Sequence, residues 1–226
     1  MKKGMLIVVE GSCDGIGKTT QFNLLCERLK KEGHDVVNHH FPTYNSYQGA
    51  PVEKYLKGDF GKPSEISNYF VNSLYAVDRG VTWYSKLKKD FDSGKTIILD
   101  RYTTSSIIYQ SALIEDEEEK KEFINFVNDF EYNKIGIKEP DLVIFLHVPF
   151  DIATKIRNER KQNDGIENDV YERDEELLKK VYKSAVFVAD YLSWDTIECS
   201  ENENMREIKS IHEEMYNKIK NISEKL

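Results

Sequence analysis

The stretch EGSCDGIGKTT, residues 10–20, is the feature that most constrains the fold of this chain. It follows the apolar run MLIVVE, which predicts a buried parallel strand over residues 5–10. A strand, a glycine-rich loop and a helix N-terminus together form a cradle of backbone N–H groups that binds phosphate. The helix is predicted over residues 19–32, with an apolar face and a glycine stop made of Phe22, Leu25, Cys26, Leu29 and Gly33.

This loop is one residue longer than the usual phosphate-binding spacing G-x-x-x-x-G-K-[ST]. Gly11 stands one position too early, whereas the order from Asp14 to Thr20 is undisturbed. The extra residue is Ser12 or Cys13, upstream of every group expected to contact phosphate, and it can bulge outward. The alternative is that it pushes Asp14 toward a second substrate. Both alternatives describe a lengthened loop rather than a decayed one.

Composition and charge exclude several classes of protein. The 226 residues suit a single domain, residues 1–226, with a sizeable core. The formal net charge of −8 leaves no diffuse basic surface for nucleic acid. No apolar run approaches the roughly 18–20 residues of a membrane span, and three cysteines without paired or metal-type spacing indicate a cytoplasmic protein. The histidines also lack metal spacing and are interpreted as solvated or packing residues: His34, His39, His40, His147 and His212.

Apolar runs alternate with amphipathic helical patterns along the rest of the chain. This order predicts an α/β fold of three layers, in which helices cover both faces of a five-stranded, mostly parallel sheet. After the first strand, strands are predicted near residues 35–41, 96–99, 141–148 and 196–199. Later helices are predicted from about residue 103, from the charged turn and helix start at 115–122, over 177–192 and over 208–222.

The longest predicted helix runs from Ser64, its N-cap, to about Asp92. Tyr75 and Arg79 are four residues apart on it, so the ring and the guanidinium lie on one face. Taken alone, such a pair is most simply a surface feature. The core face of the helix is predicted to consist of Ile66, Phe70, Leu74, Val77 and Val81.

Asp100 ends the strand TIILD, and Arg101 follows directly. The carboxyl ends of parallel strands line the crevice in which open α/β sheets bind ligands. A carboxylate there, beside bound phosphates, suits Mg²⁺, either directly or through water. The neighbouring guanidinium suits bidentate recognition of a phosphate.

The segment RNERKQNDGIEND, residues 157–169, has one large apolar side chain and contributes little to a core. Its basic residues include Arg157 and Arg160, which are three apart. A polar segment of this kind is typical of a lid that closes over phosphates and excludes water. We place the lid at about residues 155–171; the simpler interpretation is a solvated loop.

These motifs, in this order and spacing, resemble the thymidylate kinase family over essentially the whole chain. VVEGSCDGIGKTTQ is similar to the family's phosphate loop, FPTY to its F-P-R-Y, and LYAVDR to its L-F-A-x-D-R. DRYTTSSIIYQSA resembles D-R-Y-x-x-S-x-x-A-Y-Q, PDLVIFLHV resembles P-D-L-x-x-x-L-D-V, and VYERD resembles the element beside the lid. The resemblance implies a nucleoside monophosphate kinase fold, transfer of the γ-phosphoryl group of ATP to dTMP with Mg²⁺, and a homodimer.

The resemblance also implies roles for individual residues. Tyr75 would stack on thymine, Arg79 would hydrogen-bond the base, and Tyr109 would crowd the 2′ position. ATP would contact Asp14, Gly15, Ile16, Gly17, Lys18, Thr19 and Thr20, while Thr19 and Asp100 would lie near Mg²⁺. The acceptor dTMP would contact Asp14, Phe41, Pro42, Tyr44, Tyr75, Arg79, Arg101, Ser106, Tyr109, Gln110 and Glu172. The catalytic set would be Lys18, Asp14, Arg101, Arg157 and Arg160.

Two other functions stay open at this point. A deoxynucleoside kinase needs a carboxylate base for a neutral hydroxyl, but the segment after the second predicted strand has none before Glu53. A catalytically idle nucleotide-binding module would explain the long loop and Thr43, which stands where the family usually has arginine. Lys18, Asp100 and Arg101 argue against that module. His147 also departs from the family, which commonly has aspartate there.

Because Thr43 removes one cation from the predicted acceptor-phosphate site, we expect a working kinase with a weakened acceptor site. Thr43→Arg should then lower the KM for dTMP, as measured by steady-state kinetics at saturating ATP. An unchanged or raised KM would contradict this expectation.

Overall fold

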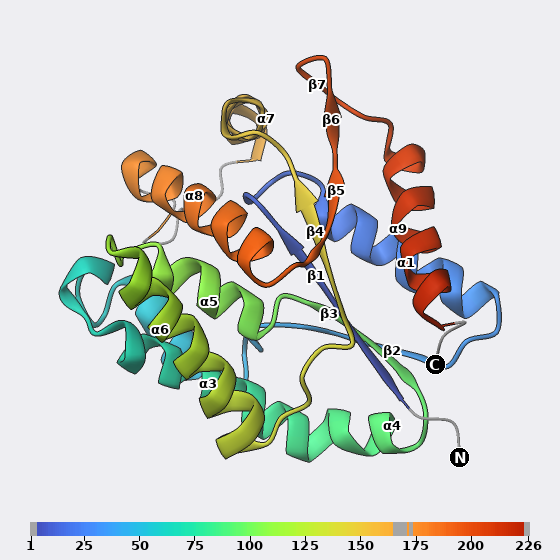
Figure 1. Cartoon of the computed structure of the whole chain (residues 1–226), viewed down its shortest axis with the longest axis horizontal. Coiled ribbons are helices and arrows are strands. Elements are labelled where there is room, and N and C mark those ends of the chain that lie inside the picture. Colours follow the sequence, from blue (N-terminus) through green and yellow to red (C-terminus); the bar gives the residue numbers. More distant parts are fainter. Residues whose placement is uncertain (1–3, 165–170, 172–173, 224–226) are drawn as a thin grey trace.

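The two most apolar strands, β1 (Met5–Gly11) and β4 (Leu142–His147), are neighbours in the middle of a five-stranded sheet. The computed structural model describes residues 4–164, 171 and 174–223. All strand pairs of this sheet are parallel, in the order β2-β3-β1-β4-β5 (Figure 1). The other strands are β2 (Val36–His40), β3 (Thr96–Asp100) and β5 (Asp195–Glu198).

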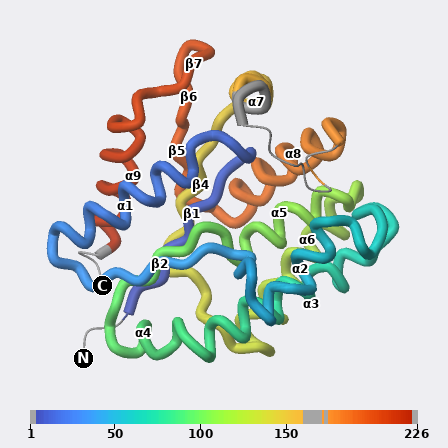
Figure 2. The backbone as a smooth tube through the Cα atoms, turned by 180° about the vertical axis from the view of Figure 1, so that it is seen from behind, coloured from blue at the N-terminus to red at the C-terminus, as the bar shows by residue number. Residues whose placement is uncertain are grey.

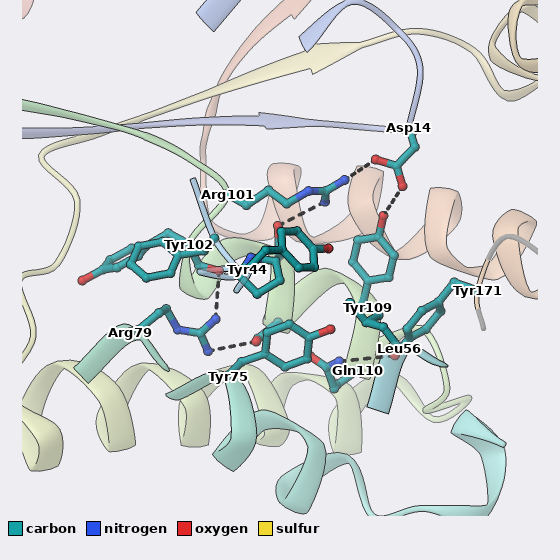
Figure 3. Close-up of a pocket in the computed structure, with 14 residues that line it drawn as sticks. Asp14, Tyr44, Leu56, Tyr75, Arg79, Arg101, Tyr102, Tyr109, Gln110 and Tyr171 are labelled. Atoms are coloured by element: carbon teal, nitrogen blue, oxygen red, sulfur yellow. Dashed lines mark hydrogen bonds and ion pairs between the residues drawn. The ribbon is translucent and has the colours of Figure 1, made fainter. Parts of the chain in front are cut away.

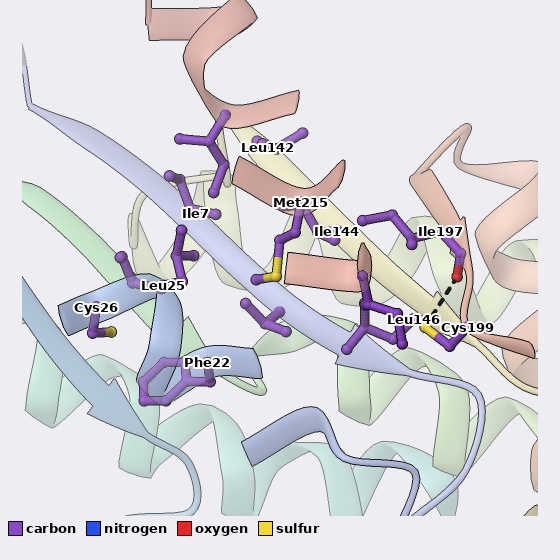
Figure 4. Packing of buried hydrophobic residues seen from close by; sticks show 14 of the residues in the cluster. Ile7, Phe22, Leu25, Cys26, Leu142, Ile144, Leu146, Ile197, Cys199 and Met215 are labelled. Atoms are coloured by element: carbon purple, nitrogen blue, oxygen red, sulfur yellow. Dashed lines mark hydrogen bonds between the residues drawn. The ribbon is translucent and has the colours of Figure 1, made fainter. Parts of the chain in front are cut away.

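Alternate residues of β1 face opposite layers of helices. Ile7 and Val9 pack against α1 (Lys18–Lys31) and α9 (Ile208–Ser223), where Leu25 and Met215 are fully buried (Figure 4). Leu6 and Val8 face the second layer. Figures 1 and 2 show this second layer on the other side of the sheet. It contains α3 (Asn68–Thr82), α5 (Thr103–Ser111), α6 (Glu117–Asn128) and α8 (Glu175–Tyr191). The predicted three-layer fold is therefore confirmed.

Local sequence signals explain several helix boundaries. Gly17 precedes α1 in the left-handed conformation, with φ of 89°, and Asp116 caps α6 by accepting a hydrogen bond from the Glu119 amide. The elements that were not predicted include the short helix α2 (Ala50–Lys57) and a small antiparallel pair of strands, β6 (Ser200–Glu201) and β7 (Asn204–Met205).

The long helix predicted over residues 64–92 is divided in the structure. It consists of a 3₁₀ turn η1 (Pro63–Glu65), α3, a π-helical turn η2 (Trp83–Leu87) and α4 (Lys88–Asp92). Its predicted core face is wrong at Phe70 and Val77, which are 46% and 53% exposed, whereas Ile66 and Leu74 pack against a core cluster. The inward side of α3 carries polar groups of the candidate site, which a rule based on apolar spacing does not detect. Its buried residues are Val71, Asn72, Ala76, Asp78, Arg79, Gly80 and Thr82.

The predicted lid begins as a helix, because α7 (Phe150–Asp164) includes its first ten residues, 155–164. Residues 165–170 and 172–173 lie outside the described part of the chain. Across the described ranges, no helix combines the length and the apolar character required to cross a membrane.

Candidate active site

The register of the sheet brings three chain segments to one edge. Val9 of β1 pairs with Asp100 of β3, and Gly11 pairs with Leu146 of β4. The phosphate loop, residues 11–18, therefore lies beside the carboxyl ends of two neighbouring strands. Gly15 and Gly17 have φ angles of 81° and 89°, a left-handed conformation that glycine adopts without strain. Asp14, Ile16 and Lys18 lie in this loop, with Ile16 buried, and Thr19 and Thr20 follow it, exposed on the first turn of α1.

Lys18 and Asp100 form an ion pair at this edge. Their side chains are only 9% and 5% exposed. His40, at the end of β2, brings its Nδ1 to 3.1 Å from the second oxygen of Asp100. Burial acts to raise the pKa of the Asp100 carboxyl, but the His40 hydrogen bond and the charge of Lys18 hold it well below its usual range. The interpretation of His40 as a merely solvated or packing residue is therefore wrong, because its ring contacts a candidate site carboxylate.

Arg101 directs its guanidinium toward the phosphate loop, where it forms an ion pair with Asp14. The second Asp14 oxygen accepts a hydrogen bond of 2.7 Å from the Tyr109 hydroxyl. Although burial opposes it, the charge of Arg101 lowers the pKa of the Asp14 carboxyl. Arg101 has φ of 67°, an unusual left-handed conformation for a residue with a side chain. This backbone turn at the end of β3 aims the guanidinium at the loop.

Glu10 is a site residue that the sequence analysis missed. It is fully buried at the end of β1. Its carboxylate accepts hydrogen bonds from the hydroxyls of Thr104 (2.9 Å) and Ser105 (2.5 Å), and it lies 3.7 Å from Arg101. Glu10 thus fixes the start of α5 next to the turn at Arg101. The sequence signal was present, since Glu10 belongs to the motif EG, but no role was assigned to it.

A pocket opens beside Asp14 and Arg101 (Figure 3). Every residue predicted to contact the acceptor lines it, except Glu172, which lies outside the described residues. Four further lining residues were not predicted: Leu56, Tyr102, Ser105 and Tyr171. Tyr102 and Ser105 lie inside the motif DRYTTSS and Tyr171 inside VYERD, whereas Leu56 had no motif to mark it. The full lining is Asp14, Phe41, Pro42, Tyr44, Leu56, Tyr75, Arg79, Arg101, Tyr102, Ser105, Ser106, Tyr109, Gln110 and Tyr171.

Arg79 lines the pocket as predicted, but it is not a surface residue. It is 1% exposed and forms two hydrogen bonds of 2.6 Å with the fully buried Glu131 of the π-helical segment η3 (Asp129–Ile135). Its other donors reach the Tyr102 carbonyl (3.2 Å) and the Ser106 hydroxyl (2.9 Å). Of the five N–H groups of a guanidinium, these contacts with described residues leave one, on Nη1. Burial acts against the charge, but Glu131 raises the pKa of Arg79.

The extra residue of the phosphate loop does not bulge into solvent, so that expectation is wrong. Ser12 is 1% exposed, and its amide donates to the Leu146 carbonyl at 3.0 Å. This hydrogen bond completes the last pair of the β1–β4 ladder, Gly11 with Leu146. Asp14 lines the pocket, and whether the extra residue displaces it stays a prediction.

The remaining predicted positions lie around this pocket or beyond it. Arg157 on α7 is half-buried, and Arg160 lies in α7 with its side chain outside the described set. Thr43 is not part of the pocket lining; its hydroxyl lies 3.0 Å from His39 Nε2 and 3.3 Å from the Thr82 hydroxyl. His147 contacts Glu198 at 2.7 Å and the Tyr182 hydroxyl at 3.1 Å, and so joins β4 to β5 and α8.

Comparisons with known proteins agree with this arrangement. Residues 9–214 match the family model described as thymidylate kinase. The chain belongs to the thymidylate kinase family. It is 34% identical over 191 residues to a probable thymidylate kinase of Thermococcus onnurineus, covering 82% of this chain and 84% of that protein. It is 32% identical over 180 residues to the thymidylate kinase of Mycobacterium tuberculosis, covering 78% and 81%.

The fold of the family is also found in a solved structure. The thymidylate kinase of Candida albicans superposes with a TM-score of 0.70 at 21% identity, covering 97% of this chain and 92% of that one. This match concerns the fold, and it agrees with the parallel five-stranded sheet between two helical layers.

The buried ion pair of this thymidylate kinase family member yields a stability prediction. Glu131→Ala should lower the free energy of unfolding by about 3–5 kcal/mol, because it leaves the guanidinium of Arg79 buried without its partner. Urea denaturation measures the loss. The control is Glu118→Ala, which removes an exposed ion pair with Lys121 and should lower the stability far less, because solvent screens exposed pairs. Equal losses in the two variants would contradict the assigned burial of the Arg79 pair.

Proposed function

We propose that the protein transfers the γ-phosphoryl group of ATP to dTMP and releases ADP and dTDP. The observation that supports this best is that two kinds of site meet at the carboxyl ends of the strands. The phosphate loop with Lys18 and Asp100 lies there beside a pocket lined by Arg101 and Arg79. The first pair suits a triphosphate donor, and the second suits a nucleoside monophosphate. The two sites are adjacent because Asp14 of the loop also lines the pocket.

On the donor side, the loop amides and Lys18 would hold the phosphates of ATP. Mg²⁺ keeps several waters and usually binds through one or two carboxylates together with substrate phosphates. The residues fit that pattern. Asp100 is a strand-end carboxylate paired with Lys18, the residue before Thr19, and among the described residues no cluster of three or more His, Cys, Asp or Glu could hold a metal by itself. Asp100 and Thr19 would hold the ion, which would neutralise charge on the transferred phosphoryl group.

On the acceptor side, the pocket would hold dTMP between its aromatic walls. Tyr75 would stack on thymine, while Ser106 and Gln110 would lie at the edge of the base. Arg101 and Tyr44 would hold the phosphate, Phe41 and Pro42 would close the wall beside them, and Tyr109 would crowd the 2′ position. The remaining N–H of Arg79 favours a base with a carbonyl at that edge, because an amino group offers hydrogens and no acceptor.

The chemistry needs no strong general base. The nucleophile is an oxygen of an ionised phosphate, so the enzyme must align two anions and offset the charge that develops between them. Asp14, held by Arg101 and Tyr109, would orient the acceptor groups rather than take a proton. Arg157 and Arg160, in a lid of about residues 155–171, would supply positive charge over the phosphates, with Glu172 following the lid on the acceptor side. The chain would act as one domain, and its three free cysteines fit the cytosol.

The geometry of the site does not favour either of the two alternative functions. A deoxynucleoside kinase would use a carboxylate just after β2, but Glu53 is not in the pocket lining and accepts a hydrogen bond from the Asn45 amide at 2.6 Å. An idle nucleotide-binding module would have no need for the paired Lys18 and Asp100 beside Arg101.

One assay separates the three functions. ADP release from ATP and Mg²⁺ is measured with thymidine, dTMP, dUMP, dCMP and AMP offered separately, and Lys18→Met serves as the inactive control. We expect release with dTMP and a kcat/KM at least about 100-fold lower with dCMP and AMP, because their amino groups cannot accept the Arg79 N–H. Release with thymidine alone would favour the nucleoside kinase. No release with any acceptor would favour the idle module.

We also propose a homodimer that forms through an outer face on α3 and α6, made of Tyr69, Phe70, Val77 and Phe126. These side chains are between 37% and 53% exposed in the single chain. Tyr69 packs against Phe126 with ring centres 4.7 Å apart, so the face is continuous across both helices. Exposed apolar patches of this kind on a soluble domain commonly mark a contact with another chain.

Val77→Glu should convert the dimer to a monomer, because it places a charge within this outer face. Sedimentation velocity measures the change. Val186→Glu alters a residue of similar size that is 38% exposed on α8, away from the outer face, and should leave the dimer intact. A wild-type monomer at micromolar concentration would show that the dimer proposal is wrong.

A further inference from the structure

The extra residue of the phosphate loop is joined to the segment that leads into α7. The Ser12 hydroxyl donates to the Val148 carbonyl at 3.0 Å and accepts from the Val148 amide at 3.0 Å. Both residues are buried, at 1% and 0% exposure. One side chain therefore satisfies both backbone groups of Val148, which follows β4 directly.

This contact replaces the next step of the strand pairing. In a parallel ladder, a residue that donates to one neighbour also accepts at its own carbonyl from the residue two positions further along that strand. The Ser12 amide donates to Leu146, so regular pairing would bring the Val148 amide to the Ser12 carbonyl. The Ser12 hydroxyl accepts it instead. The main chain can thus leave the sheet and begin the loop while the buried amide of Val148 stays satisfied.

The segment beyond Val148 carries groups toward the phosphate loop. α7 begins two residues later, and Ala153 on its first turns is buried in the same cluster as Ile16 of the loop. Arg157 lies four residues after Ala153 on α7, so the two side chains share the face of the helix that packs toward the loop. Within the described part of the chain, Arg157 Nε and the Thr154 hydroxyl are buried without a hydrogen-bond partner.

We propose that Ser12 is a positioning residue that fixes the base of α7 to the phosphate loop, so that Arg157 is held in register with the loop amides around the donor phosphates. This role rests on the proposed use of ATP at the loop. Ser12, the added residue, thereby connects the phosphate loop to α7, the helix that begins the lid. The loop amides from Asp14 onward keep their usual order. Removing the Ser12 hydroxyl should weaken binding of the donor nucleotide and leave binding at the acceptor pocket unchanged.

The test compares Ser12→Ala with Ser184→Ala. Ser184 is also 1% exposed, and its hydroxyl likewise has two contacts, with the Ile108 carbonyl and the Ser111 hydroxyl, both at 2.8 Å. It lies on α8, in the opposite layer from the phosphate loop. Both variants lose a buried hydroxyl, so they should lose similar thermal stability. Binding is measured by titration with a fluorescent ATP analogue in the absence of dTMP, and KM is then measured for each substrate.

We expect Ser12→Ala to weaken binding of the ATP analogue and raise the KM for ATP by about tenfold, the factor that corresponds to roughly one net hydrogen bond. The KM for dTMP should stay within about twofold of wild type, and Ser184→Ala should change neither. Arg157→Ala should weaken analogue binding less in the Ser12→Ala background than in wild type, because the two residues act through one contact. If Ser12→Ala is not recovered folded, Ser12→Cys, with weaker hydrogen bonding, should give a smaller change in the same direction.

The proposal is overturned if Ser12→Ala binds the analogue like wild type, or if Ser12→Ala and Ser184→Ala weaken it equally. Additive effects of Ser12→Ala and Arg157→Ala would also overturn it. The binding titration needs no phosphoryl transfer. A wild-type protein that binds the analogue but releases no ADP with dTMP would therefore contradict the proposed function, while the comparison of the serine variants would still decide the role of Ser12.

Discussion

The parallel pairing of β1 with both β3 and β4 is the constraint on which the candidate site depends. Parallel strands end at the same edge of a sheet, and the register places Val9 opposite Asp100 and Gly11 opposite Leu146. Groups 82 and 87 residues apart in the chain, Lys18 with Asp100 and Asp14 with Arg101, are thereby brought into direct contact. A shift of register by one residue would turn each of these side chains to the opposite face and separate the pairs.

The cations at this edge are paired with carboxylates of this chain, and the pairs differ in exposure. Removing an ion pair from water costs several kcal/mol per ion, so a buried pair persists only with good geometry and further hydrogen bonds. Glu131 meets that condition for Arg79, since its side chain is fully buried and binds through both oxygens. Asp14 is different, because 34% of its side chain is exposed beside Arg101. In the proposed function, an acceptor phosphate would therefore exchange with Asp14 at Arg101, whereas Glu131 would remain bound to Arg79.

Local periodicity predicted the layers and the five strands, and the short motifs, through the family resemblance, predicted ten of the fourteen residues that line the pocket. The sequence-based predictions were wrong or missing where a residue's role depends on a contact with a residue far away in the chain. Phe70 and Val77 have helical spacing, but spacing does not say which side of α3 faces the sheet. Glu131 lies 52 residues beyond Arg79, and no motif in the sequence connects the two. Ser12 looked like an insertion into solvent because its hydrogen-bond partner, Val148, is 136 residues away.

These differences divide the pocket into a fixed end and an adjustable end. At one end, Arg79 is held by Glu131, Tyr102 and Ser106, so in the proposed function its remaining N–H would be a fixed donor that discriminates between bases. At the other end, Arg101 has two carboxylate partners. Glu10 is buried, whereas Asp14 is partly exposed. Only the second of these contacts is exposed enough to be replaced. In the proposed function, this site would recognise the base through donors that are already fixed, and the acceptor phosphate would take the place of Asp14 beside Arg101.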